Sequence, residues 1–201
     1  MIYRQTPLYK FIHLCEKHNQ EKCVLDCGAG GVCPPLGLFA KHGYQTAGIE
    51  FDEIQLNRVR EFETQYGLQL NISLGDMRKI PFPDATFAQV YSYNSIFHLA
   101  KIDIRRAIFE MMRVMKPDGF LFLNLLSIED SECGEGECVG DNEYEQEENG
   151  ERTIHSFHNT SEADPYFAGL EILQKETRTI YTTIKGKEIR QSYIDYYLKK
   201  S

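Results

Sequence analysis

The stretch from Cys23 to Gly31 constrains this chain more than any other. It reads Cys-Val-Leu-Asp-Cys-Gly-Ala-Gly-Gly, an apolar strand core followed by an acid and then by three glycines within four residues. A strand that ends in such a loop and leads into a helix lets the backbone approach a nucleotide-like ligand closely. Glycine suits this position because it has no Cβ to block the approach or the turn. The same loop is also compatible with an ordinary tight turn, so other residues must decide.

The rest of the chain alternates between strand and helix patterns. We expect strands over 23–27, 45–49, 69–74, 87–92 and 120–126, and helices over 6–19, 34–43, 52–66 and 103–115. This alternation is typical of a parallel sheet with right-handed crossovers. Two long strand-like runs, 170–184 and 188–198, flank Lys185-Gly186-Lys187 and predict a hairpin. We therefore expect an α/β fold: a doubly wound sheet of about seven strands, mostly parallel, that ends in an antiparallel edge.

The length of 201 residues, of which 42% are hydrophobic, suits one domain over residues 1–201. Within it we expect an N-terminal helix region (1–19), an acidic flap (129–158) and a C-terminal hairpin (170–199). No apolar run approaches the ~20 residues of a membrane span, and residues 1–7 do not resemble a signal peptide. Six irregularly spaced cysteines do not resemble a secreted disulfide framework. We expect a cytoplasmic protein with reduced thiols and no membrane partner.

The net charge of −8 is concentrated in one segment. Residues 129–151 contain eleven acids and no Lys or Arg, and without them 19 acids face 22 bases. A broad nucleic-acid surface needs clustered Lys and Arg, so we expect no nucleic acid partner. The acidic run is interpreted as a solvated, mobile flap, and a cation-selecting lid is the alternative.

Acidic residues follow three successive strands. Asp26 lies at the end of the first expected strand, Glu50 at the end of the second and Asp76 after the third. Ligands of open parallel sheets bind outside the carboxyl ends of the strands. A carboxylate at the position of Glu50 can accept two hydrogen bonds from ribose hydroxyls. Three such residues in register favour a nucleoside-binding edge.

Four motifs together resemble those of class I S-adenosylmethionine-dependent methyltransferases. They are Val24 to Gly30, Gly48-Ile49-Glu50, Gly75 to Phe87 and Met115 to Phe120, in the family's order and spacing. A nicotinamide-binding Rossmann domain is the main competitor. Its G-x-G-x-x-G fingerprint fails here because position 33 is Cys.

The resemblance implies S-adenosyl-L-methionine as cofactor. It implies that Asp26, Gly28 and Gly30 hold the methionine part, Glu50 the ribose, and Asp76 with Met77 the adenine. The full expected set is Asp26, Gly28, Ala29, Gly30, Glu50, Phe51, Asp76, Met77, Arg78, Ser92 and Tyr93. The family often has a third glycine where this chain has Val32, with Gly31 beside it. This departure indicates a loop turn shifted by one residue.

The acceptor side is less defined. The segment Tyr91 to His98 lacks the Asn/Asp-Pro-Pro-aromatic motif that related enzymes use on exocyclic amines of bases. His98, His155, His158 and Tyr93 are candidates to face the acceptor or to accept a proton, and packing roles are the alternative. His155 and His158 belong to a segment that loosely resembles small-molecule and tellurite-resistance-like methyltransferases. Cys133 and Cys138 with these two histidines have unusual spacing for zinc, and we expect no metal.

We therefore predict a methyltransferase that moves a methyl group to an O, N or S atom of a small molecule, as a monomer or homodimer. Two other classes remain open. One is a non-catalytic cofactor-binding or partner-activating subunit. The other is an RNA or protein methyltransferase that needs a partner.

Overall fold

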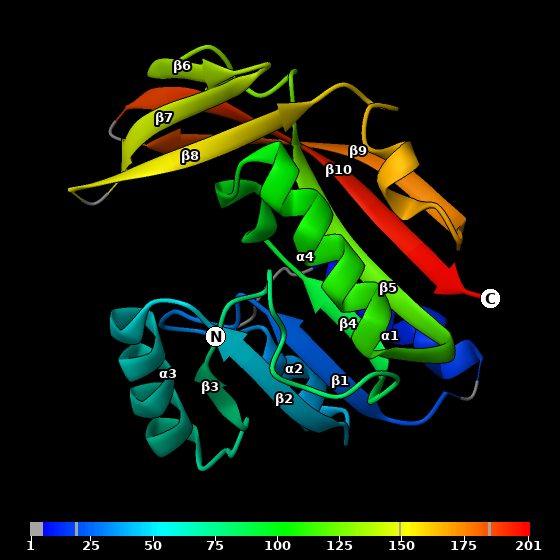
Figure 1. The fold of residues 1–201 in the computed structure, drawn as a ribbon. Helices are drawn as coiled ribbons and strands as arrows, with labels where there is room; N and C mark the ends of the chain where they lie inside the picture. Colours follow the sequence, from blue (N-terminus) through cyan, green and yellow to red (C-terminus); the bar gives the residue numbers. More distant parts are fainter. Residues whose placement is uncertain (1–5, 19, 149, 185) are drawn as a thin grey trace.

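The computed structural model describes residues 6–18, 20–148, 150–184 and 186–201 (Figure 1). The α-helices are α1 (Thr6–Lys17), α2 (Leu36–Lys41), α3 (Glu53–Tyr66) and α4 (Lys101–Val114), with short 3₁₀ turns η1 (Ile96–His98) and η2 (Asp164–Phe167). The first five strands are β1 (Cys23–Cys27), β2 (Gln45–Glu50), β3 (Ile72–Leu74), β4 (Phe87–Ser92) and β5 (Met115–Ser127). The others are β6 (Glu137–Gly140), β7 (Glu143–Glu148), β8 (Glu151–His158), β9 (Leu170–Ile184) and β10 (Lys187–Lys200).

The main sheet has the order β3-β2-β1-β4-β5-β10-β9. Its first five strands are parallel, and β10 pairs antiparallel with both β5 and β9. This arrangement confirms the expected α/β class and the antiparallel C-terminal strand. The predicted hairpin forms this antiparallel edge of the sheet: β10 inserts next to β5, and β9 is the outermost strand. Lys185, in the predicted hairpin turn, lies outside the described residues.

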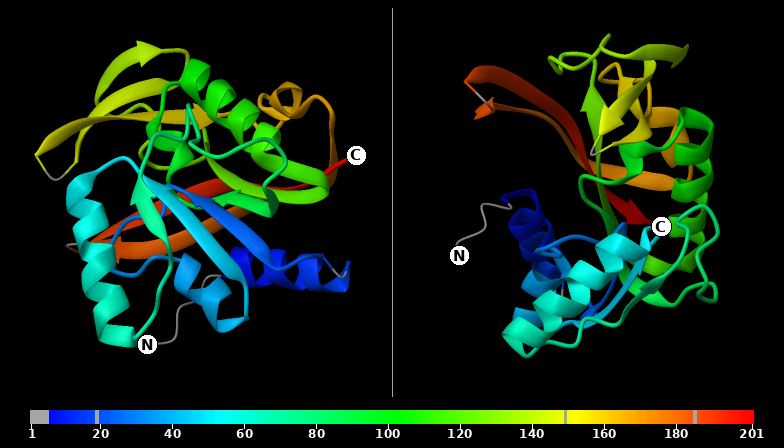
Figure 2. Two further views of the ribbon diagram at one scale, coloured as in Figure 1. Left: turned by 60° about the horizontal axis from the view of Figure 1, so that its bottom comes forward. Right: turned by 90° about the vertical axis from the view of Figure 1, so that its left-hand side faces the viewer.

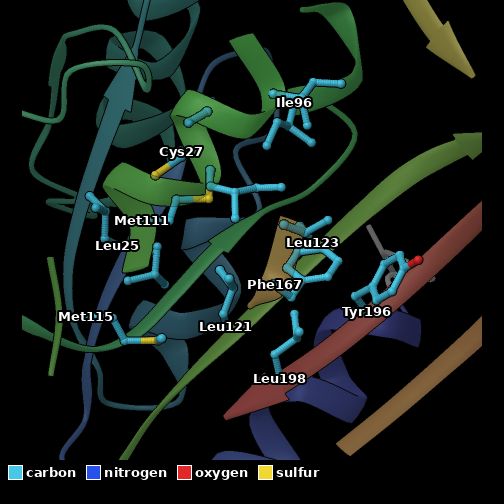
Figure 3. Close-up of a cluster of buried hydrophobic side chains, with 14 of the residues drawn as sticks. Leu25, Cys27, Ile96, Met111, Met115, Leu121, Leu123, Phe167, Tyr196 and Leu198 are labelled. Atoms are coloured by element: carbon cyan, nitrogen blue, oxygen red, sulfur yellow. The ribbon is translucent and has the colours of Figure 1, made fainter. Parts of the chain in front are cut away.

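Helices cover both faces of the sheet, with α1, α2 and α3 on one side and α4 on the other (Figure 2). Strand β5 supplies both cores, because successive side chains of a strand point to opposite faces. Phe120 and Phe122 pack with α1 and α2, whereas Leu121 and Leu123 pack with α4 (Figure 3). The β5 side chains on both faces of the sheet, from Phe120 to Leu123, are fully buried, as expected from the continuous apolar sequence of this strand.

Several local signals act as the sequence predicts. The Asp52 side chain caps α3 by accepting a hydrogen bond from the Ile54 N–H at 2.7 Å, and Gly67 ends the helix with φ 61°. Within β5, the pairing with β4 is interrupted between Met115 and Phe120, and Asp118 in that stretch has φ 59°. The third strand is also shorter than predicted.

The acidic flap folds as a three-stranded antiparallel meander, β6-β7-β8, which the sequence reasoning did not predict. Strand β8 joins it to the main sheet by pairing with the last two residues of β5, Leu126 with Phe157 and Ser127 with His158. The meander lies above the carboxyl ends of β1, β2 and β4 in Figure 1. The insertion is therefore placed over the edge where a ligand of such a sheet binds.

Candidate cofactor and acceptor site

The glycine loop packs between the carboxyl end of β2 and the segment that follows β4. The N–H groups of Gly28 and Ala29 donate to the Ile49 carbonyl at 2.9 and 3.0 Å. A Cβ on Gly28 would lie 1.9 Å from Ser95 Oγ, and Gly28 has φ 92°. Glycine is thus required here by both conformation and space.

Gly31 resolves the departure from the family's third glycine. It has φ 101°, and a Cβ there would meet only Gln55 Oε1 at 4.0 Å. Val32 is 72% exposed. The left-handed conformation therefore falls at Gly31, one residue before the position where the family often has glycine, and Val32 is free to carry a side chain.

Asp26 is 1% exposed and lies at the carboxyl end of β1. Its Oδ2 accepts a hydrogen bond from the Tyr91 hydroxyl at 2.6 Å, whereas Oδ1 has no hydrogen-bond partner in the described part of the chain. Burial raises the pKa of Asp26 to about 8; the bond from Tyr91 acts in the opposite direction, and the charge of Glu50 adds to the rise. The site thus contains a buried carboxyl group with one vacant acceptor.

Glu50 ends β2, directly beside the loop. Its Oε1 accepts from the Asp52 N–H at 2.9 Å, which orients the carboxylate. A Cβ on Gly30 would lie 2.4 Å from Glu50 Oε2. Glu50 therefore lies against the glycine loop, whereas Phe51, which is in the expected cofactor-binding set, is 72% exposed.

Asp76 and Met77 reach the same edge, and Arg78, also in the expected set, pairs with Asp76 in a way that the sequence did not predict. Arg78 binds the Asp76 carboxylate through Nε and Nη2, the latter at 2.7 Å, and also binds Asp103 at 2.9 Å. The Arg78 guanidinium lowers the pKa of Asp76. Met77 Cε lies 3.4 Å from a Cβ built on Gly28.

The segment after β4 closes the other side of the loop. Ser92 is fully buried, and its hydroxyl has no hydrogen-bond partner among the described residues. Asn94 has φ 55°, and its side-chain oxygen accepts from Asn124 Nδ2 at 2.6 Å. Tyr93 is partly buried and packs against Phe122 with 6.2 Å between ring centroids. Ser95 was not predicted as a site residue, although it lies in the quoted segment.

The candidate histidines lie on η1 and on β8 of the meander, where they form two groups. His98 of η1 and His155 of β8 lie edge to face, with ring centroids 4.7 Å apart. Burial, and then the neighbouring His155, lower the pKa of His98 to about 4. His158 is fully buried beside the Lys101–Glu162 ion pair, and burial lowers its pKa to about 4. At neutral pH, the His98 and His158 imidazoles are therefore uncharged.

The acidic segment and Ile189 of β10 line an open surface pocket of about 320 Å³. It is lined by Ser131, Glu132, Glu135, Gly136, Glu145, Gln146, Glu147 and Ile189. Within the described ranges, no group of three or more His, Cys, Asp or Glu is arranged to hold a metal. No helix of the described residues has the length and apolarity of a membrane span.

Comparison with known proteins agrees with this geometry. The model of a family described as "Methyltransferase domain" matches residues 25–123. An S-adenosylmethionine-dependent methyltransferase from Clostridium acetobutylicum has a TM-score of 0.71 at 12% identity, over 99% of this chain and 93% of that one. The magnesium protoporphyrin IX methyltransferase of Synechocystis, solved with bound cofactor, has a TM-score of 0.64 at 15% identity, over 98% and 79%.

Among curated relatives, the 24-methylenesterol C-methyltransferase 3 of Arabidopsis thaliana is 33% identical over 111 residues, 54% of this chain. This chain covers 29% of that relative's length. The fold, the family match and the order of the site residues together define the class. Residues 25–123 carry the methyltransferase domain of this family, and the chain has the fold of class I S-adenosylmethionine-dependent methyltransferases.

The described residues fit S-adenosylmethionine, the cofactor of this family. Asp26 Oδ1 and Ser92 Oγ are buried polar atoms with no hydrogen-bond partner among the described residues, as expected of a site that a polar ligand completes. The glycine loop leaves no room for a Cβ at positions 28 and 30. Backbone and side chains at the carboxyl edge are thus shaped for close contact with a ligand.

Proposed function

We propose that this chain transfers a methyl group from S-adenosylmethionine to an O, N or S atom of a small molecule. The observation that carries the proposal is the convergence of Asp26, the glycine loop, Glu50, Met77 and Ser95 at one sheet edge. When bound, the cofactor supplies an activated methyl group on a sulfonium. The chain's own residues bind and orient the two partners and exclude water.

We assign the cofactor's methionine part to Asp26, Gly28, Ala29, Gly30 and Ser92. Glu50 takes the ribose hydroxyls, since it stands at the end of β2 with one oxygen free of the Asp52 N–H. Asp76, Met77 and Phe51 take the adenine, and Arg78 acts by orienting Asp76. These assignments follow the family resemblance and are supported by the contacts around the loop.

We place the acceptor between the segment after β4 and the meander. Phe97 and Tyr193 pack with 6.1 Å between ring centroids and form an apolar cluster with Leu126 and Phe157. His98 contacts this cluster through Phe97, with 4.7 Å between ring centroids, and His155 packs against His98. Uncharged His98 is suited to accept a hydrogen bond from an acceptor O–H or N–H. His158, being fully buried against Tyr166, is assigned a packing role.

The family model ends at Leu123, before the meander and the β9–β10 hairpin. The sterol substrate in the name of the Arabidopsis relative is therefore not transferred to this chain. We keep a single domain, a cytoplasmic location and a monomer or homodimer as part of the proposal. The six free thiols support the location.

The test uses methyl-labelled S-adenosylmethionine, the full chain and a fractionated cell extract. Label in the low-mass fraction, lost in the Glu50→Ala variant, supports the proposal. Label in the RNA or protein fraction favours the partner-dependent alternative. Binding of S-adenosylhomocysteine with no label in any fraction favours a non-catalytic subunit.

A further inference from the structure

Asp26 and Tyr91 are fixed neighbours on adjacent strands. They lie opposite each other in the parallel register of β1 and β4, and the Tyr91 hydroxyl donates to Asp26 Oδ2 at 2.6 Å. The Tyr91 ring is fully buried, stacked on Phe39 at 4.8 Å and 17° and edge-on to Phe11 at 6.4 Å. The Tyr91 ring is packed against Phe39 of α2 and Phe11 of α1. Its hydroxyl therefore has little freedom to move away from the Asp26 carboxyl group.

The carboxyl group is incompletely satisfied. Oδ1 is buried and has no hydrogen-bond partner among the described residues. The titratable groups that act on Asp26 are Tyr91 from β4, Glu50 from β2 and the adjacent Cys27, and none of them supplies a positive charge. A purely structural Asp–Tyr pair would be expected to satisfy both oxygens, because an orphaned buried acceptor is costly. The unpaired Asp26 Oδ1, with no cation nearby among the groups named above, is suited to a positively charged hydrogen-bond donor of the ligand.

We propose that Tyr91 is a positioning residue for cofactor binding. It holds Asp26 so that Oδ1 meets the ammonium group of the methionine part, and binding releases one proton from Asp26 to solvent. This inference rests on the proposed function. The ammonium keeps its own protons, and the O–H bond of the Asp26 carboxyl is the one that breaks.

The charge balance supports this order of events. Burial raises the pKa of Asp26 to about 8, so near pH 7 the ligand-free carboxyl is mostly protonated. An ammonium in contact favours the carboxylate and lowers its pKa. The bond from Tyr91 also favours the carboxylate, so its removal should move the transition to higher pH.

The experiment is calorimetric titration with S-adenosylhomocysteine at several pH values, in buffers of different ionisation enthalpy. For the wild type near pH 7, we expect a binding enthalpy that varies with the buffer and an affinity that rises towards pH 8 to 9. Tyr91→Phe should bind about tenfold or more weakly at pH 7, with its pH profile moved upward. Asp26→Asn should lose the buffer dependence.

Tyr197→Phe is the matched control. Tyr197 is a buried tyrosine on the same face of the sheet, but its hydroxyl donates to the Pro7 carbonyl. Wild-type affinity and pH profile in Tyr91→Phe, or no proton release by the wild type, would overturn the inference. Proton release is measured on the wild type alone, so this test can be made even if Tyr91→Phe fails to fold. If the wild type itself does not bind S-adenosylhomocysteine, the proposed function fails instead.

Discussion

Gly30, in the loop after β1, lies against the side chain of Glu50 at the end of β2. A Cβ at position 30 would stand 2.4 Å from Glu50 Oε2 and 2.7 Å from its Cδ. The same Cβ would lie 2.7 Å from Gln55 Cβ, near the start of α3. The absence of a side chain at Gly30 thus sets where the Glu50 carboxylate can be.

The first prediction concerns Gly30→Ala. The new methyl group should push the Glu50 carboxylate away from the ribose position, because the end of a flexible side chain moves more easily than backbone. We expect the affinity for S-adenosylhomocysteine to fall about 10- to 100-fold, because one or two charge-assisted hydrogen bonds from the ribose to Glu50 would be lost. Calorimetry measures this.

Glu50→Gln provides the internal check on that prediction. If the two substitutions act through the same carboxylate, the double variant should be less impaired than the two losses combined. Independent, additive losses would contradict the proposed coupling between Gly30 and Glu50.

The second prediction concerns the ion-pair chain Asp76–Arg78–Asp103. Arg78→Ala should lower the free energy of unfolding by about 1 kcal/mol at neutral pH, a modest amount because Arg78 and Asp76 are about one-third exposed. Arg78 lowers the pKa of Asp76, so this stabilisation is present above the ordinary range near ~3.9 and is lost as pH falls through the lowered value. Denaturant unfolding of both proteins from pH 7 to pH 3 measures the difference.

Lys79→Ala is the matched control, since Lys79 is the next residue, carries the same charge and is exposed. It should leave the free energy of unfolding within about 0.5 kcal/mol of wild type. A difference between wild type and Arg78→Ala that persists undiminished in strong acid would argue against the ion pair as its source.

The third prediction concerns His158. Its pKa is lowered to about 4 by burial, whereas the unfolded chain takes up the proton near ~6.5. Stability should therefore be fully present above about pH 6.5 and fall as pH drops towards 4, by about 2 kcal/mol between pH 6.5 and 5. His158→Gln should flatten this slope in urea unfolding.

His13→Gln serves as the control for that slope, because His13 is an exposed residue of α1. It should reproduce the wild-type pH dependence. Equal slopes for wild type and His158→Gln would show that His158 is not held uncharged by burial.

Local sequence signals predicted much of this fold and of the cofactor edge. The glycine loop, Glu50 after β2 and the Asp52 cap each depend on residues within a few positions, and the structure places them as expected. The bond between Tyr91 and Asp26 could not be predicted, because it depends on the register of β1 against β4. The contact between His98 and His155 likewise depends on how β8 returns to the sheet.

The meander was missed for a different reason. Strand β7 reads Glu-Tyr-Glu-Gln-Glu-Glu, and glutamate is depleted in strands. The strand forms because its partners supply pairing and charge: Arg152 of β8 binds Glu137 of β6 at 2.6 Å and Glu145 of β7 at 2.9 Å. Such cross-strand compensation is set by the fold and is not visible in a local window.

The fourth prediction concerns how the meander is attached. Glu143 of β7 accepts a hydrogen bond from the Lys101 N–H at the start of α4, and Ser156 of β8 donates to the Leu99 carbonyl at 2.7 Å. Glu143→Ala should leave the α4 end unpaired and raise the rate of limited proteolysis within 137–158 about tenfold. Glu151→Ala, an exposed glutamate of β8, should leave the cleavage rate unchanged. Identical rates for the two variants would remove Glu143 as the attachment point.

The most direct test of cofactor binding at this sheet edge is titration of the 201-residue chain with S-adenosylhomocysteine. We expect one binding site per chain and a binding heat in Tyr197→Phe equal to that of the wild type. Gly30→Ala and Glu50→Ala should bind S-adenosylhomocysteine with strongly reduced affinity. No heat and no thermal stabilisation of the folded wild type at millimolar ligand would contradict it.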